Sequence, residues 1–282
     1  MLGATGFLGT RLVPKLRNSG HVVVTHGRTG GDYRTPLGCP EQTHKLLDEI
    51  NPDVILSLVG LTNVDLCEND PHQAYLDNVR PIENISSWLS ISSRPSHLIY
   101  ISTDQVYDGL GPHAEDEVKL TNYYAFSKYS GEMAALRSGG TILRTNFIGK
   151  SNLENSRGLS DWLHGALLRG EMIRVFDDIK FSPISIASLL EIIEIFVQKK
   201  GNGIFNVGSR DGFSKADFAY AFAKELDISN LLMKRVDSEK VNFFCAYRPK
   251  DMRMNCLKLE EFLGIKVPSL TEEIEKVAKE YL

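Results

Sequence analysis

The sequence has few cysteines, no block of basic residues and no long apolar run, and each absence excludes a class of protein. The four cysteines among 282 residues are scattered and form no Cys-x-x-Cys pair, which argues against a zinc site or a disulfide framework. The net charge of −4 includes no basic cluster for nucleic acid. No apolar run approaches the roughly 18 residues of a membrane span, and the N-terminus lacks the features of a signal peptide. We therefore expect a cytoplasmic protein with no bound metal and no membrane or nucleic-acid partner.

The composition and the hydrophobic pattern indicate a soluble α/β protein. Hydrophobic residues make up 42% and charged residues 24%, as in ordinary globular domains, and 282 residues can form one large domain or two fused ones. Apolar segments with strand character at 20–25, 53–60, 97–101 and 141–144 alternate with segments of helical character at 41–50, around 74–79 and after 124. This alternation predicts βαβ units and a doubly wound parallel sheet.

Glycines at positions 3, 6 and 9 precede a segment with helical spacing. Such glycines allow a tight turn and a close approach of the backbone to a ligand, and the following helix N-terminus favours a pyrophosphate. The spacing differs from the Gly-x-Gly-x-x-Gly of the commonest dinucleotide fingerprint. Only Met1 and Leu2 precede Gly3, so we expect a very short first strand. The sequence leaves open whether the chain begins at an internal methionine or has lost a few residues. A short central strand should cost stability, because its neighbours lose ladder partners.

The second predicted strand ends at His26-Gly27-Arg28, the position at which an acidic residue would hold the ribose 2′-hydroxyl of NAD. No acid occurs there, and Arg28 is available to accept a 2′-phosphate. The position therefore favours NADP(H) over NAD(H). The alternative is that Arg28 is an ordinary solvated arginine of a loop.

Two polar motifs follow the strand predicted over 97–101. Thr103 comes at its carboxyl end, the edge at which open α/β sheets bind ligands. Tyr124 and Lys128 are four residues apart at a predicted helix start, so their side chains lie on one face. A neighbouring ammonium favours the phenolate and makes a phenol a more usable acid. Tyr123 is the rival phenol, but its +4 neighbour is Ser127, and we therefore assign the proton donor to Tyr124. The alternative is a packed tyrosine beside a solvated lysine.

The character of the chain changes near residue 150. A polar segment predicted as a loop over 151–158 leads to a segment of helical spacing at 159–168. Strand character returns near 184 and at 203–208, and helices are predicted at 257–263, with Gly264 as the stop, and at 270–281. We predict a dinucleotide-binding domain over 1–150 and a smaller substrate-binding lobe over 151–282, with 184–208 returning to the main sheet.

These motifs together resemble the extended short-chain dehydrogenase/reductase superfamily. The run from Ser102 to Gly109, Asn63-Val64-Asp65, Ser182-Pro183 and Arg248-Pro249 are similar to the pattern of the dTDP-4-dehydrorhamnose reductase family. The resemblance covers nearly the whole chain. It implies a Rossmann domain with a smaller C-terminal substrate lobe, NADP(H) or NAD(H) as cofactor and a nucleotide-linked 4-keto sugar as substrate. The sequence identifies no face for a homodimer, which this fold often forms, and the oligomeric state stays open.

The resemblance also implies roles for individual residues. The family's catalytic Thr, Tyr and Lys correspond to Thr103, Tyr124 and Lys128. The implied cofactor contacts are Gly3, Thr5, Gly6, Phe7, Leu8, Gly9, Arg28, Val59, Gly60, Asn78 and Lys128. The implied substrate contacts are Thr62, Asn63, Val64, Thr103, Asp104, Tyr124, Phe147 and Arg248.

Three positions depart from related patterns. Gln105 replaces the Glu that the superfamily's dehydratases carry, which argues against dehydration. Phe147 stands where the family has a Trp expected near the sugar nucleotide, and the acidic run before the second helix is missing at 35–38. Two alternatives therefore stay open beside the reductase. One is another epimerase or reductase of the superfamily, and the other is a non-catalytic binding protein like the regulatory subunit of methionine adenosyltransferase.

Overall fold

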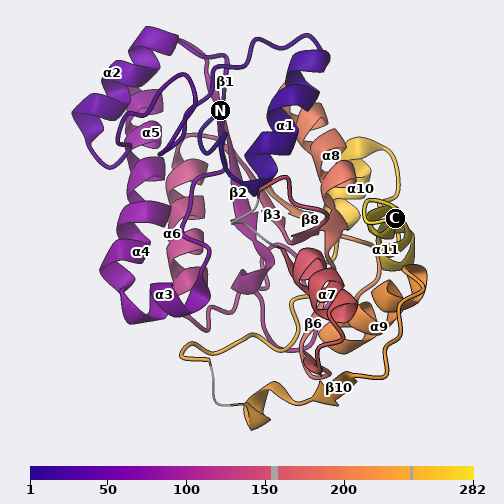
Figure 1. The fold of residues 1–282 in the computed structure, drawn as a ribbon. Coiled ribbons are helices and arrows are strands. Elements are labelled where there is room, and N and C mark those ends of the chain that lie inside the picture. Colours follow the sequence, from indigo (N-terminus) through magenta and orange to yellow (C-terminus); the bar gives the residue numbers. More distant parts are fainter. Residues whose placement is uncertain (154–157, 242–243) are drawn as a thin grey trace. The chain divides into compact units, whose positions relative to one another are not determined.

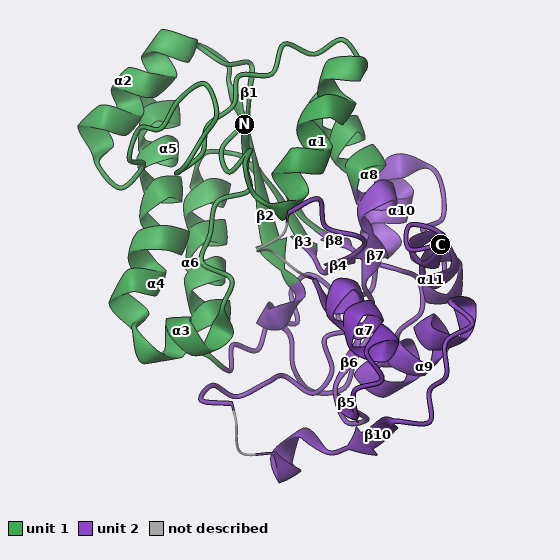
Figure 2. Ribbon diagram, viewed as in Figure 1, with its two compact units in different colours: residues 1–103, 122–144, 190–205 green, residues 104–121, 145–189, 206–282 purple. Residues whose placement is uncertain are grey.

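The computed structural model describes residues 1–153, 158–241 and 244–282. The chain divides into two compact units, coloured separately in Figure 2. Unit 1 comprises residues 1–103, 122–144 and 190–205, and unit 2 comprises residues 104–121, 145–189 and 206–282. Residues 104–121 and 145–150 belong to unit 2, which differs from a division after residue 150, whereas 190–205 belong to unit 1 and lie within the 184–208 segment predicted to return to the main sheet.

Unit 1 is built on a four-stranded sheet. Its strand order is β1 (Val54–Ser57), β2 (His97–Thr103), β3 (Thr141–Thr145) and β8 (Gly203–Val207). β1 and β2 are parallel, with Val54 opposite His97. Their residues form almost continuous apolar runs, because a parallel sheet is covered on both faces. Leu98, Ile99 and Tyr100, for example, are at most 1% exposed.

Helices cover both faces of this sheet (Figure 1). α1 (Phe7–Asn18) and α8 (Ile186–Lys199) lie on one side, where Lys15 and Glu194 form an ion pair at 2.9 Å. The other side carries α2 (Pro40–Ile50), α3 (Val64–Asn69), α4 (Pro71–Asn78), α5 (Arg80–Ile91) and α6 (Tyr123–Arg137). The result is the α/β, Rossmann-like architecture predicted from the sequence, and the carboxyl ends of β1 and β2 lie at the edge where open sheets of this kind bind ligands.

The first strand is reduced to one paired residue. Leu2 forms parallel bridges to both His26 and Ser57, and its amide donates to the Leu56 carbonyl at 2.9 Å. The prediction of a strand over 20–25 is wrong, because these residues form no strand and Val22 is 96% exposed. A single bridging residue cannot supply ladder partners along the whole of the predicted strand.

Unit 2 consists of short strand pairs with helices packed on them. β4 (Phe147–Ile148) is parallel to β7 (Ile184–Ser185), and β5 (Ile173–Phe176) is parallel to β10 (Met233–Val236). β6 (Lys180–Phe181) is antiparallel to β9 (Phe213–Ser214). The helices of this unit are α7 (Leu159–Leu168), α9 (Lys215–Glu225), α10 (Leu257–Leu263) and α11 (Leu270–Ala278), with 3-10 turns at Asp104–Val106 and Ser238–Lys240. Its core is mainly aliphatic and includes the fully buried side chains of Phe181, Phe218 and Phe222.

Several predicted elements of the second half are confirmed. The helix at 159–168 is α7, and α10 ends at Gly264, whose φ of +73° is the left-handed conformation that glycine favours. The last helix ends at residue 278 rather than 281. The predicted loop over 151–158 lies partly outside the described residues. Across the residues that the structure describes, no helix is both long and apolar enough to cross a membrane.

Candidate functional site

The turn that leads into α1 depends on its glycines. Gly3 has φ of +79°, a region that residues with a side chain rarely adopt. A Cβ on Gly9 would lie 2.5 Å from the Gly3 carbonyl oxygen, so only glycine lets α1 begin this close to the turn. Gly6 is the N-cap and offers no side chain to cap the helix. The first turn, which includes the predicted contacts Phe7 and Leu8, therefore presents backbone N–H groups of the kind that bind anions.

Arg28 lies beside this turn. A Cβ on Gly27 would lie 2.5 Å from the Thr5 hydroxyl, so the two segments touch. The Arg28 side chain is exposed. Asp32 directs its carboxylate to the Thr25 amide and hydroxyl, each at 2.8 Å, and these hydrogen bonds lower the pKa of Asp32. The Asp32 carboxylate therefore accepts hydrogen bonds from within the protein, whereas the exposed Arg28 side chain can reach a ligand.

Helix α6 places Tyr124 and Lys128 on its buried face. Asn122 caps the helix by accepting a hydrogen bond from the Ala125 amide at 2.8 Å. The side chains of Tyr124 and Lys128 are 6% and 4% exposed, whereas Tyr123 is 46% exposed. The orientation thus agrees with the prediction that Tyr124, and not Tyr123, shares a face with the lysine.

The Lys128 ammonium lies in polar but desolvated surroundings. Its Nζ donates to the Ile101 carbonyl at 2.8 Å and lies 4.1 Å from the centroid of the Tyr100 ring. Burial lowers the pKa of Lys128 to about 7, against the opposing effects of Glu132 and Cys67. The lysine can therefore gain or lose a proton near neutral pH, and a nearby negative charge would favour the charged form.

The loop after β1 joins this lysine through Asn78. A Cβ on Gly60 would lie 2.9 Å from the Asn78 amide oxygen and 3.7 Å from Lys128 Nζ. Asn78 accepts from the Leu61 amide at 2.7 Å and donates to the Leu61 carbonyl at 3.1 Å and the Ser127 hydroxyl at 2.8 Å. Three residues predicted as cofactor contacts, Gly60, Asn78 and Lys128, are therefore adjacent in unit 1.

The other predicted residues of this loop differ in what their side chains do. Asn63 is the N-cap of α3 and accepts from the Leu66 amide at 3.0 Å. Val64 is 8% exposed, and Val59 packs on the core of unit 1. Thr62 is exposed. Within unit 1, Thr62 is therefore the predicted substrate residue of this loop whose side chain is most open to a ligand.

A buried ion pair holds the end of β2, and sequence reasoning missed it. Glu132 on α6 and Arg144 on β3 are both fully buried, with Arg144 Nη2 donating to Glu132 Oε2 at 2.6 Å. The Ser102 hydroxyl donates to the same carboxylate, and Thr103, the next residue, is 5% exposed at the last position of β2. The available signals were Arg144 at the end of an apolar strand and Glu132 four residues after Lys128, on the same face of the helix.

The remaining predicted substrate residues belong to unit 2. Asp104 begins the 3-10 turn after β2, and the Asn146 amide donates to its Oδ2 at 2.8 Å. Phe147 is half-buried in β4. The Arg248 guanidinium lies 4.3 Å from the centroid of the Phe244 ring. The structure therefore places Asp104, Phe147 and Arg248 in unit 2, and Thr103, Tyr124 and Lys128 in unit 1.

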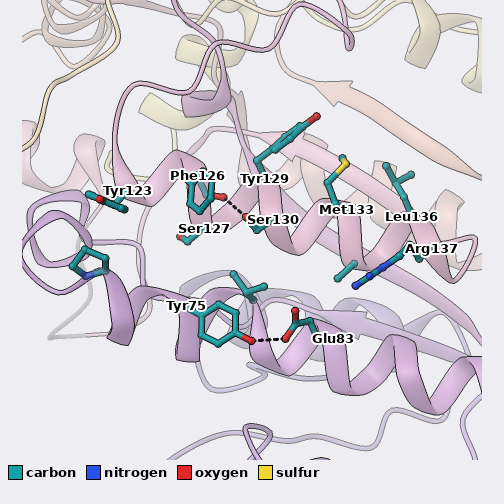
Figure 3. Close-up of a pocket in the computed structure, with 13 residues that line it drawn as sticks. Tyr75, Glu83, Tyr123, Phe126, Ser127, Tyr129, Ser130, Met133, Leu136 and Arg137 are labelled. Carbon is teal, nitrogen blue, oxygen red and sulfur yellow. Dashed lines mark hydrogen bonds between the residues drawn. The ribbon is translucent and has the colours of Figure 1, made fainter.

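A groove of about 880 Å³ runs along the outer side of α6 and is a separate feature (Figure 3). It is bounded by α4, α5 and α6, and its lining includes Tyr75, Tyr123, Phe126 and Met133. Phe126 and Met133 lie on the face of α6 opposite Tyr124, as the helical spacing requires. Because this groove lacks the tyrosine–lysine pair, we do not take it as the site of chemistry.

Comparisons with known proteins place the whole chain in one family. The family model described as the RmlD substrate binding domain matches residues 1–282. A dTDP-4-dehydrorhamnose reductase of Sinorhizobium fredii is 27% identical, over 90% of this chain and 88% of the relative. Methionine adenosyltransferase 2 subunit beta of Xenopus tropicalis is 26% identical, over 94% of this chain and 83% of the relative.

A solved structure supports the same assignment at the level of the fold. The crystal structure of dTDP-4-dehydrorhamnose reductase from Bacillus anthracis, in complex with NADP, superposes with a TM-score of 0.88 at 24% identity, covering 99% of this chain and 97% of that chain. With the glycine turn, the tyrosine–lysine helix and a family match that spans every residue, the chain belongs to the RmlD substrate binding domain family.

Proposed function

We propose that the protein is an NADP(H)-dependent reductase of a nucleotide-linked 4-keto sugar, like dTDP-4-dehydrorhamnose reductase. The observation that carries the proposal is the group formed by Tyr124, Lys128, Asn78 and Gly60, which lie together at the carboxyl edge of the sheet. The name of the Sinorhizobium relative supports the type of substrate.

The residues of the first turn fit a dinucleotide. The Cβ that Gly9 lacks would occupy the space between turn and helix, and the first turn of α1 offers backbone N–H groups to a pyrophosphate. Arg28 would hold a 2′-phosphate, which favours NADP(H) and leaves NAD(H) as the second choice. Lys128 would hold the ribose next to the nicotinamide. When bound, the cofactor supplies the hydride that reduces the keto group.

The protein's own residues supply the proton and hold the carbonyl. The Tyr124 hydroxyl gives its proton to the sugar oxygen as the carbon receives hydride, so a C=O group becomes a CH–OH group. Thr103 donates a hydrogen bond to that oxygen, and protonated Lys128 favours the tyrosinate that remains. Positioned acid catalysis of this kind is worth about 10²–10⁴-fold in rate.

A binding role is the second candidate, since a relative of similar identity is a subunit of methionine adenosyltransferase 2. In that case the tyrosine–lysine pair would contribute to nucleotide binding or packing alone. Absence of NADPH oxidation with any keto sugar, together with co-purification with an adenosyltransferase, would favour this alternative over the reductase.

Substitution of Tyr124 by Phe tests the reductase directly. This change keeps the buried ring and removes the acid, so the protein should fold and bind NADPH as before. Turnover of dTDP-4-dehydrorhamnose, followed by NADPH absorbance, should fall about 10²–10⁴-fold, or roughly 3–5 kcal/mol of barrier. Tyr123→Phe is the matched control on the exposed face and should have little effect. Loss of activity in the control alone would show that Tyr123 is the donor. No effect in either variant would favour the binding role.

A further inference from the structure

Unit 2 contains a lysine in unusual surroundings at the start of α9. Lys215 is the first residue of this helix, and its ammonium lies 3.3 Å from the centroid of the Phe181 ring, which is fully buried. Among the described residues, that ammonium forms no ion pair and donates no hydrogen bond. The residue is partly exposed, so the three donor hydrogens of the ammonium are open to solvent or to a ligand.

Keeping a cation at this position opposes stability. Burial lowers the pKa of Lys215 to about 8, against the opposing effect of the Asp104 charge. An apolar side chain of similar length would fill the space above Phe181 without this penalty. A partly exposed donor that has no acceptor among the described residues is available to a ligand that binds beside it.

The side chains near Lys215 indicate where such a ligand would bind. Asp104 directly follows the last residue of β2, and Asn146 directly follows β3, the neighbouring strand. The Asn146 amide donates to Asp104 Oδ2 at 2.8 Å and so fixes the carboxylate. A carboxylate can accept several hydrogen bonds at once, so Asp104 can accept from a ligand hydroxyl in addition to its partners within the protein. Both residues thus follow the strand ends at which open α/β sheets bind ligands.

We propose that Lys215 is a further residue that recognises the sugar ring of the substrate, donating to one hydroxyl while Asp104, the substrate contact that the family resemblance implies, accepts from another. The inference rests on the proposed function, which makes the substrate a nucleotide sugar. A cation and an anion together suit a neutral hydroxylated ring, because a hydroxyl can both donate and accept. Their opposite charges largely cancel, so the pair does not by itself select the diphosphate.

Calorimetric titration with dTDP-glucose and with dTDP separates the sugar from the nucleotide. The NADP-loaded protein should bind dTDP-glucose more tightly than dTDP. Lys215→Met should weaken dTDP-glucose binding about tenfold to hundredfold, the range for a charged hydrogen bond, and leave dTDP binding unchanged. Lys224→Met, an exposed lysine on the same helix, is the matched control and should bind both ligands as the original protein does. Asp104→Asn is a second variant that keeps the shape of its side chain and should show the same selective loss.

Each outcome decides between the sugar contact and its rivals. Equal weakening for both ligands would overturn the proposal, because it would place Lys215 on the diphosphate. Unchanged binding of dTDP-glucose in both variants would also overturn it and leave Lys215 a packing residue. If wild-type protein reduces no keto sugar but binds dTDP-glucose in a Lys215-dependent way, the sugar contact holds and the proposed reduction fails. If it reduces the keto sugar and Lys215→Met keeps the same KM, only the sugar contact fails.

Discussion

Replacing Lys128 by methionine should stabilise the unliganded protein at low pH even though it removes a proposed catalytic group. The pKa of Lys128 is lowered from 10.5 to about 7, a difference that corresponds to roughly 5 kcal/mol at 1.36 kcal/mol per pKa unit. This is the order of magnitude by which keeping the buried lysine charged destabilises the native state below pH 7. Methionine has similar length and no charge, but it leaves the Ile101 carbonyl without its donor, a loss of about 1–3 kcal/mol. We therefore expect a net gain of about 2–4 kcal/mol at pH 6.

The gain should depend on pH in a defined direction. Between about pH 7 and 10.5 the unfolded chain binds a proton at Lys128 that the native state does not, so wild-type stability rises with pH in this window. The methionine variant lacks this titrating group, so its stability does not increase over the same pH range for this reason. Its advantage should therefore be largest below pH 7, shrink as the pH increases, and disappear near about pH 9.

Urea or thermal unfolding at pH 6, 7.5 and 9 measures this difference. At about 2–4 °C per kcal/mol, the Tm of Lys128→Met should exceed that of wild type by roughly 5–15 °C at pH 6. Lys45→Met, at an exposed position of α2, is the control and should change Tm little at any pH. A variant that is less stable than wild type at pH 6, or a gain that is the same at all three pH values, would refute the reasoning about a desolvated ammonium.

Two further predictions concern the cofactor and the support of the site. Arg28→Ala should weaken NADPH binding by about 1–3 kcal/mol and leave NADH binding unchanged in fluorescence titrations, because a charge-assisted contact with the 2′-phosphate is lost; tighter binding of NADH than of NADPH by wild type would contradict the assignment. Glu132→Gln should lower the free energy of unfolding by about 3–5 kcal/mol, because the fully buried Arg144 keeps its charge without a partner. Adding Arg144→Met should restore most of that stability, and failure to do so would show that the hydrogen bonds of Glu132 matter more than its charge.

The features of the fold and site that could be predicted from the sequence are those that depend on the spacing of residues close together in the chain. The glycine turn and the orientation of Tyr124 follow from backbone conformation and helical periodicity, which neighbouring residues determine. The strand predicted over 20–25 failed because strand pairing depends on a partner that the run itself does not reveal. Val22 has the residue type of a buried strand and is nevertheless exposed, and the bridges of this part of the chain lie just beyond the predicted strand, from His26 to Leu2 and to Tyr33.

Two features of the candidate site depended on information that local patterns contain weakly or not at all. The Glu132–Arg144 pair joins a helix to a strand, and which charges meet in a core is a consequence of tertiary packing. Lys215 was missed with its helix α9, although a capping signal was present. Ser214 accepts a hydrogen bond from the Asp217 amide at 3.0 Å, and a serine three residues before an acid is typical of a helix N-terminus.

The Asn78 side chain has a consequence for motion. Loops usually open easily, and their amide protons exchange with solvent much faster than those of helices. The Leu61 amide, in the loop after β1, is instead held by a side chain that is 1% exposed and that also bonds Ser127 on α6. Exchange of the Leu61 amide proton with solvent therefore requires the contacts between the loop, α4 and α6 to open. The deuterium uptake of a single loop amide thus measures how often the region around Gly60 and Lys128 loosens, independently of any substrate.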